Sequence, residues 1–146
     1  MGSLIRHVLV ATDFGPASAN AVTYAAAIAR GVGARLHLVH VLEQPFVTSG
    51  PYELHLPDTP VRHERRYQLA VAKLRRVAAD LDGVDTSVEV RDGTAAAALV
   101  KAATDYGADL ILLGTYEHGA MQHWIASGLD ERLRRDAPCP VLAVRQ

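Results

Sequence analysis

The stretch from residue 108 to residue 145 decides the fold and reads ADLILLGTYEHGAMQHWIASGLDERLRRDAPCPVLAVR. It contains two apolar runs, 110–113 and 141–144, and the first of them stops at Gly114. A short, continuous apolar run that is closed by glycine is typical of a strand buried on both faces. The two runs therefore predict two strands of a parallel sheet.

The residues between these runs predict a loop and a short helix. Asp130 and Glu131 come first in the helical segment and the arginines come last, which suits the helix macrodipole. Ser127 precedes the segment and is the expected N-cap. A loop that leaves the carboxyl end of a parallel strand and enters a helix N-terminus is a common place for ligands. We therefore look for a binding site here.

The rest of the chain alternates between the same two patterns. Apolar runs or period-two alternation predict three further strands, and 3.6-residue spacing of apolar side chains predicts helices after them. The strands are expected at 8–11, 36–41 and 84–90, and the helices at 16–31, 60–82 and 94–107. This order predicts a single α/β domain over residues 1–146, with an open five-stranded parallel sheet, helices on both faces and right-handed crossovers. The segment 43–60 has four prolines, the last of which opens the next helix, and no clear period, which indicates a long loop.

Composition excludes several classes of protein. The formal net charge of the 146 residues is −1, so no global charge favours nucleic acid. The basic residues of 62–76 are interpreted as a solvated helix face, because no aromatic platform accompanies them. No apolar run is long enough to span a membrane, and the lone Cys139 suits a reducing compartment. We expect a cytoplasmic protein without a membrane or nucleic-acid partner.

The glycine and histidine patterns of the sequence do not match the common nucleotide-binding and metal-binding motifs. Gly114 and Gly119 have the spacing of a phosphate-binding P-loop, but Ala120 and Met121 stand where that loop needs Lys and Ser or Thr. No Gly-x-Gly-x-x-Gly follows the first strand, which argues against a dehydrogenase. The seven histidines show no metal-ligand spacing. The sequence therefore favours neither a P-loop enzyme nor a metal site.

Asp13 is the most informative single residue. It stands at the expected carboxyl end of the first strand, beside a Gly15-Pro16 helix start. One interpretation is a turn or N-cap aspartate, and the other is an acceptor for hydroxyl or amino groups of a ligand. The residues alone leave both interpretations open.

Three stretches carry a resemblance to the universal stress protein family. They are HVLVATDFGPASANAVTYAAAIARGVGARLHLVHVLE (7–43), VRDGTAAAALVKAATDYGADLILLGT (90–115) and APCPVLAVR (137–145). The resemblance covers nearly the whole chain except the loop. It implies a sheet with strand order 3-2-1-4-5 and a homodimer formed through the last strand, here Val141–Val144.

The resemblance also implies an adenine-nucleotide site that departs from the family pattern. Many members bind ATP through a glycine, two residues, a second glycine, nine residues, then glycine and Ser or Thr. Gly114 matches the first glycine, Glu117 replaces the second, and Ser127-Gly128 inverts the last pair. The nucleoside side is better preserved. The implied cleft is lined by Ala11, Thr12, Asp13, Val41, Gly114, Thr115, Ser127 and Gly128.

These observations lead to two expected functions. The first is a non-enzymatic, homodimeric stress-response or regulatory protein with a degenerate nucleotide-binding cleft, no cofactor or a weakly bound ATP or AMP, and a regulatory protein partner whose identity the sequence does not give. The alternative is an ATP-binding switch with at most slow hydrolysis. A metabolic enzyme on the same fold is disfavoured because no paired acid and base or nucleophile and base stands near Gly114.

Overall fold

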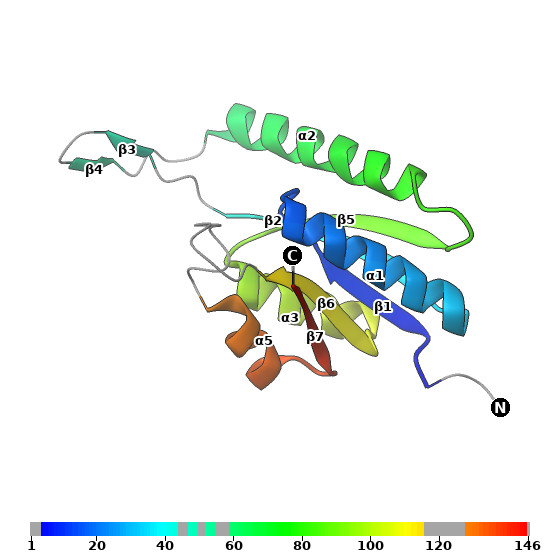
Figure 1. The fold of residues 1–146 in the computed structure, drawn as a ribbon. Helices are drawn as coiled ribbons and strands as arrows, with labels where there is room; N and C mark the ends of the chain where they lie inside the picture. Colours follow the sequence, from blue (N-terminus) through cyan, green and yellow to red (C-terminus); the bar gives the residue numbers. More distant parts are fainter. Residues whose placement is uncertain (1–3, 44–46, 50–51, 55–58, 116–127, 146) are drawn as a thin grey trace.

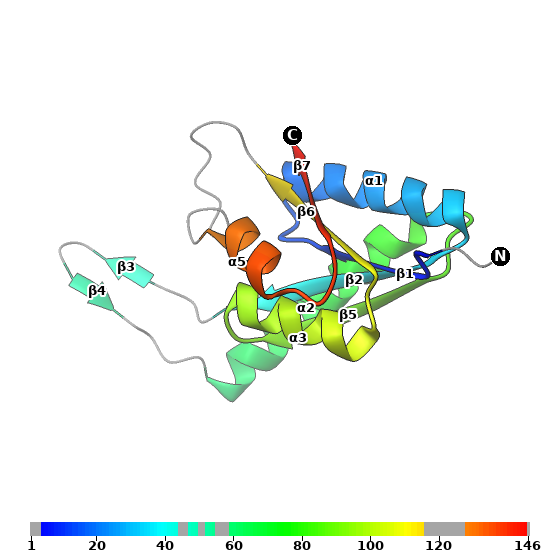
Figure 2. The ribbon, with the colours of Figure 1, turned by 90° about the horizontal axis from the view of Figure 1, so that it is seen from below.

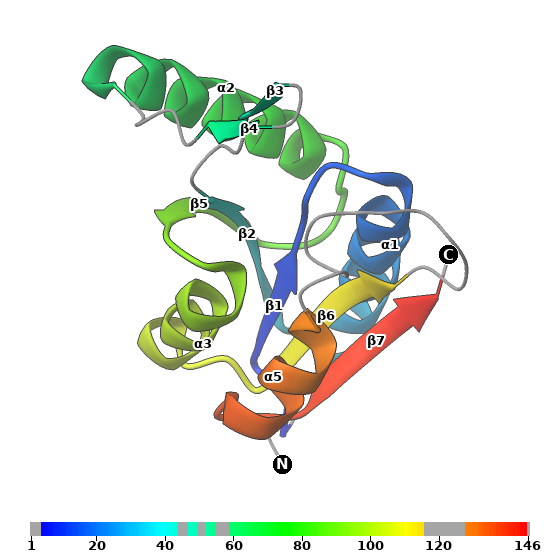
Figure 3. The ribbon, with the colours of Figure 1, turned by 90° about the vertical axis from the view of Figure 1, so that its left-hand side faces the viewer.

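Five parallel strands form the sheet of the computed structural model, which describes residues 4–43, 47–49, 52–54, 59–115 and 128–145. The strand order is β5-β2-β1-β6-β7, which confirms the expected order 3-2-1-4-5 and places β5 and β7 at the two edges. Figure 3 shows the five strands in this order, with β7 farthest from β5. Their bounds are β1 His7–Ala11, β2 Arg35–Leu42, β5 Thr86–Asp92, β6 Leu110–Thr115 and β7 Val141–Arg145.

Helices cover both faces of the sheet, as expected from the sequence. In Figure 1, α1 and α2 lie above the sheet and α3 and α5 below it, and Figure 2 shows the lower pair from its own side. Each pair packs on its own apolar cluster. None of the helices in the described ranges is long and apolar enough to cross a membrane. The helix bounds are α1 Pro16–Val32, α2 Pro60–Ala79, α3 Ala95–Tyr106 and α5 Leu129–Asp136.

Small side chains let α1 lie close to the sheet. Its buried face carries five alanines, one valine and one serine, and the alanines at 21, 25 and 29 are fully buried. Because alanine projects only a methyl group, the helix backbone can approach the strands more closely than a leucine-faced helix could. This close approach determines the geometry where β6 passes the first turn of α1.

Two helix ends follow their sequence signals, and one does not. Thr59 accepts a hydrogen bond from Arg62 N at 3.2 Å and caps α2, and Gly107 ends α3 in the left-handed conformation. The expected N-cap of α5 at Ser127 is wrong, because α5 begins after Gly128, whose φ is 68°. Only glycine adopts this φ without strain, so the chain turns there through backbone freedom instead of a side-chain cap.

The segment 43–60 is not wholly loop. It contains β3 Val47–Ser49 and β4 Tyr52–Leu54, which pair antiparallel as a two-stranded hairpin. Strands of three residues are too short to show a clear period of two, so the sequence pattern did not reveal them.

Candidate functional site

The carboxyl ends of β1 and β6 form the switch point of this sheet. The two strands are parallel neighbours, with Val8 opposite Leu110 and Val10 opposite Leu112. The connection after β1 enters α1 on one face, whereas α5, the next described helix after β6, packs on the other face. In an open α/β sheet, ligands bind in the crevice where adjacent connections leave toward opposite faces.

The loop between β1 and α1 is held rigid by short hydrogen bonds. Thr12 Oγ1 accepts from Phe14 N at 3.0 Å, and the Thr12 carbonyl accepts from His40 Nδ1 at 2.7 Å. Asp13 Oδ1 accepts from Gly15 N at 2.8 Å and from Ser18 Oγ at 2.6 Å. Phe14 has a φ of 66°, which is strained for a bulky residue. These bonds fix the direction of Asp13.

One of the two carboxylate oxygens of Asp13 therefore stabilises the turn. Both hydrogen bonds to its side chain fall on Oδ1. Oδ2 makes no hydrogen bond with any residue in the described ranges, and the side chain is only partly buried. The turn interpretation is right for Oδ1, while Oδ2 remains an acceptor that a ligand could reach.

Three other predicted site residues are buried. Ala11, Thr12 and Val41 are each exposed by 2 % or less. The side chains of Ala11 and Val41 belong to the apolar cluster under α3 and α5. The side chains of Ala11 and Val41 are therefore closed to a ligand.

Gly114 is explained by packing. A Cβ atom built on Gly114 would lie 2.3 Å from both the carbonyl carbon and the oxygen of Ala17, and 2.7 Å from Ser18 N. These atoms are backbone of the first turn of α1, so they cannot rotate away. The next residue, Thr115, donates its hydroxyl to the Val144 carbonyl at 3.4 Å and is tied to β7.

The remaining predicted site residues lie at or beyond the limit of the described part. Gly128 is placed as the N-cap of α5. Ser127 and Glu117 lie outside the described residues. The described part of the candidate cleft is thus the part around Asp13, which the family resemblance assigns to a nucleoside, and Gly114, the first glycine of the family motif.

Sequence reasoning missed Ser18 and His40. Ser18 also accepts from Asp13 N at 3.1 Å, so it holds the aspartate from both backbone and side chain. Its position five residues after Asp13, in the first turn of a helix, was the available signal. His40 supports the loop from β2, and burial lowers its pKa from 6.5, although the bond to Thr12 and the charge of Asp13 oppose this shift.

A second polar cluster lies between β2 and β5, and it was also missed. His37 contacts Ser87 Oγ through Nδ1 at 2.6 Å and Glu89 Oε2 through Nε2 at 2.7 Å, and its ring stacks on Tyr106. The order hydroxyl, imidazole, carboxylate resembles a nucleophile with its base. However, Glu89 is also held by Arg91, which bridges to Asp105 at 3.0 Å. The contacts match the strand register, in which His37 pairs with Ser87 and Val39 with Glu89.

No group of three potential metal ligands occurs within the described ranges. The fold and the cleft define an open-sheet α/β domain with its candidate ligand site between the first and fourth strands of the parallel order. The model of the universal stress protein family matches residues 4–145, and the chain belongs to that family.

Individual relatives agree with this assignment. A universal stress protein of Thermus aquaticus is 33% identical over 143 residues, which cover 97% of this chain and all of the relative. The crystal structure of a family protein from Burkholderia pseudomallei is 29% identical, with a TM-score of 0.64 and coverage of 99% and 98% of the two chains.

Two further solved structures carry adenine nucleotides and share the fold. A universal stress protein in complex with cAMP is 20% identical, has a TM-score of 0.68 and covers 98% of each chain. A universal stress protein from Archaeoglobus fulgidus in complex with dAMP is 16% identical, has a TM-score of 0.60 and covers 97% of this chain and 99% of its own.

Proposed function

We propose that this protein is a non-enzymatic, cytoplasmic, homodimeric regulator of the stress response whose cleft accepts an adenine nucleoside monophosphate better than ATP. The observation that carries the proposal is Asp13. Its Oδ1 atom is fixed by Gly15 and Ser18, and its Oδ2 atom is left for a ligand at the switch point. A carboxylate oxygen held in this way is a preorganised acceptor for ribose hydroxyls or an adenine amino group.

The phosphate side supports the preference for a monophosphate. The backbone amides of a glycine loop normally approach the phosphates closely. Here Glu117 replaces the second glycine of the family motif, which places a carboxylate in the sequence where the anion would bind. A carboxylate about 4 Å from a phosphate charge, at an effective dielectric near 20, opposes binding by roughly 4 kcal/mol before relaxation. ATP brings more negative charge to this place than AMP does.

Solved relatives provide a parallel for the ligand class. Two of them are solved in complex with cAMP and dAMP, each of which carries one phosphate. These complexes support the proposal that a nucleoside monophosphate binds near Asp13 in this chain. The alternative function, an ATP-binding switch with slow hydrolysis, requires tight ATP binding in spite of Glu117.

A non-enzymatic role requires that the cluster of His37, Ser87 and Glu89 is structural and not catalytic. Ser87 lies on the edge strand β5, and Tyr106 also contacts it. Glu89 is shared between His37 and Arg91. We interpret the cluster as a cross-strand network that stabilises the sheet edge, because its members satisfy one another and follow the strand register.

The substitution Asp13→Asn tests the proposal directly. The amide oxygen of asparagine can still accept from Gly15 N and Ser18 Oγ, so the turn should persist. Its NH₂ group replaces the acceptor Oδ2 by a donor, and loss of a charged hydrogen bond costs about 1.5–3 kcal/mol. We expect AMP affinity, measured by calorimetric titration, to fall about tenfold or more while the unfolding midpoint in urea changes little. Unchanged AMP affinity in a folded variant would remove Asp13 from the site.

A further inference from the structure

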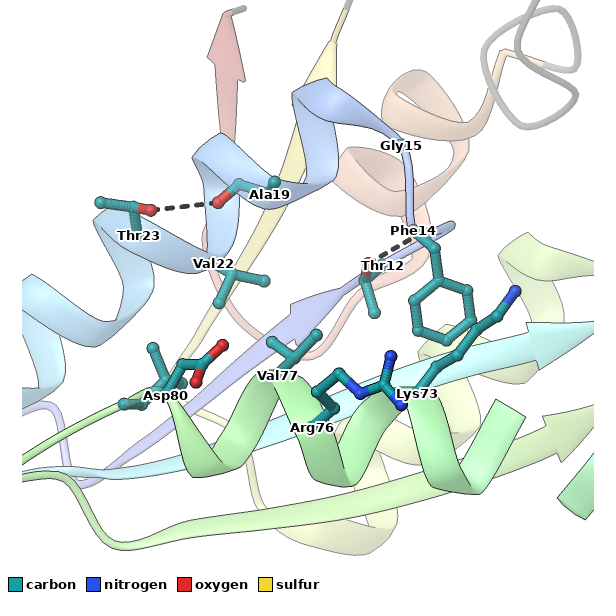
Figure 4. Close-up of a pocket in the computed structure, with 11 residues that line it drawn as sticks. Thr12, Phe14, Gly15, Ala19, Val22, Thr23, Lys73, Arg76, Val77 and Asp80 are labelled. Atoms are coloured by element: carbon teal, nitrogen blue, oxygen red, sulfur yellow. Dashed lines mark hydrogen bonds between the residues drawn. The ribbon is translucent and has the colours of Figure 1, made fainter. Parts of the chain in front are cut away.

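A groove lies between α1 and α2, on the face of the sheet opposite to α3 and α5. Its volume is about 390 Å³, within the range of small-molecule sites. In Figure 4, Val22 of α1 and Val77 of α2 point toward each other across the groove, and Phe14 lies over α2 at one end. Leu81 extends the apolar lining beyond the end of α2. The apolar cluster that contains Ala11 and Val41 packs on the other face, so this groove is separate from the core beneath the nucleoside side.

Two cations of α2 line this groove. Lys73 and Arg76 are three residues apart and therefore on the same side of the helix. In Figure 4 the Arg76 guanidinium lies between Val77 and Phe14, and the Lys73 side chain runs along Phe14 at the end of the groove. The Lys73 ammonium lies 5.2 Å from the centre of the Phe14 ring. Within the described ranges, neither cation forms an ion pair or a hydrogen bond with a protein group. These residues are thus part of the groove and not only of a solvated helix face.

The positive charge continues beyond Phe14. A smaller cavity of about 230 Å³ shares Phe14 and Lys73 with the groove and is lined by Arg66, His40 and Leu69. Burial is the main cause of the lowered pKa of His40, and the positive charges of Lys73 and Arg66 act in the same direction. Asp80, the acidic residue of the main groove, stands at the opposite end from Lys73 in Figure 4. The groove is therefore polarised, with cations near Phe14 and an apolar body that leads toward Asp80.

We infer that this groove binds a small anionic amphiphile, a carboxylate with an unbranched apolar chain. The carboxylate would pair with Lys73 and Arg76, and the chain would lie between Val22, Val77 and Leu81. A headgroup at the other end would meet the negative charge of Asp80, so charge complementarity fixes the orientation. A neutral chain would gain only the apolar contacts and leave both cations without a partner. The inference does not rest on the proposed function, although Thr12 and Gly15, which line one end of the groove, belong to the loop that carries Asp13.

Decanoate is the probe for this inference, and decanol is its neutral counterpart. Binding is measured on the full chain by calorimetric titration and mapped by amide chemical shifts in NMR spectra. We expect decanoate to bind at least about tenfold more tightly than decanol, because a charge-assisted contact to two cations adds to the same apolar burial. Shift changes should appear at Val22, Val77 and Leu81, and saturating AMP should not displace the probe. Equal binding of the two compounds, or displacement by AMP, would overturn the inference.

A matched pair of double variants separates the groove from general charge. Lys73→Met with Arg76→Met keeps the apolar stems and removes both groove cations. Arg65→Met with Arg75→Met removes two exposed charges of the same helix that do not line the groove. We expect the first variant to lose at least about tenfold in decanoate affinity and the second to retain it within about twofold. The inference fails if both variants bind alike, and circular dichroism of both confirms that α2 is intact.

Discussion

Gly114 shows how one residue can carry two explanations. The family motif assigns its lack of a side chain to phosphate binding, whereas the structure gives it a packing role against Ala17 and Ser18 of α1. The two roles make different predictions for stability. A glycine that serves only phosphate binding can be replaced without loss of stability when no ligand is present. A glycine at which an added Cβ would lie 2.3 Å from a helix backbone is required for the fold itself.

Gly114→Ala should destabilise the protein without any nucleotide present. The added methyl group would overlap backbone atoms of α1, and overpacking of this kind costs about 3 kcal/mol or more. Gly31→Ala is the control, because Gly31 lies within α1 with open space around it and no positive φ. There alanine should stabilise by up to about 1 kcal/mol. Urea unfolding of both variants checks the pair, and equal effects would contradict the packing role.

His40 predicts a pH dependence of stability. Burial lowers its pKa in the folded protein from the ordinary value of 6.5, so the folded state favours neutral imidazole. The unfolded chain therefore binds more protons between the folded pKa and 6.5, and stability must fall as pH is lowered through this window. His40→Gln, which retains a donor for the Thr12 carbonyl, should show a weaker decline. Each unit of difference between the folded and unfolded pKa corresponds to about 1.4 kcal/mol of stability. Urea midpoints that change in parallel for the two proteins between pH 7.5 and 5 would contradict this contribution.

At the scale of elements, the sequence predicted those features that repeat along the chain. The buried runs of β1 and β6 and the alanine-rich face of α1 have clear periods, so their type was predictable. The hairpin β3–β4 and the Gly128 cap were not, because each depends on a few residues without a period. The His37 network was invisible because it joins residues about fifty positions apart through the register of β2 and β5.

The edge strand β7 supports the proposed homodimer. It lies at one end of the sheet, and within the described residues β6 is its strand partner. Leu142 is 41% exposed on this strand, whereas Val144 is 6% exposed. An apolar edge with unpaired backbone groups is a hazard unless another chain covers it, and two copies about a two-fold axis would satisfy both edges.

Leu142→Lys should therefore convert a dimer to a monomer. A lysine on the edge would place like charges opposite each other across the two-fold axis and remove apolar contact. Leu69→Lys is the control, since Leu69 is 56% exposed but lies on α2, and this variant should remain dimeric. Sedimentation velocity at micromolar concentration distinguishes the two states. Wild-type protein that sediments as a monomer would refute the proposed interface.

For the whole molecule, the predicted topology located the candidate site but not the contacts of its residues. The order 3-2-1-4-5 places Asp13 and Gly114 at one crevice, and the sequence identified both. Asp13 uses one carboxylate oxygen for the turn and leaves the other for a ligand, and Gly114 leaves room for the backbone of α1. Both properties depend on distances of 2–3 Å, which no sequence pattern encodes. The central claim is that this cleft keeps its nucleoside side and has lost affinity for a triphosphate.

Calorimetric titration of AMP and ATP into wild-type protein and Glu117→Gly tests this claim most directly. We predict that wild type binds AMP more tightly than ATP, and that Glu117→Gly improves ATP affinity by about tenfold or more, which corresponds to about 1.4 kcal/mol, while AMP changes less. Glu131→Gly, another acidic-to-glycine change in the same part of the chain, is the control for loss of one negative charge. Sub-micromolar ATP binding by wild type that Glu117→Gly does not improve would contradict the account and favour the ATP-binding switch.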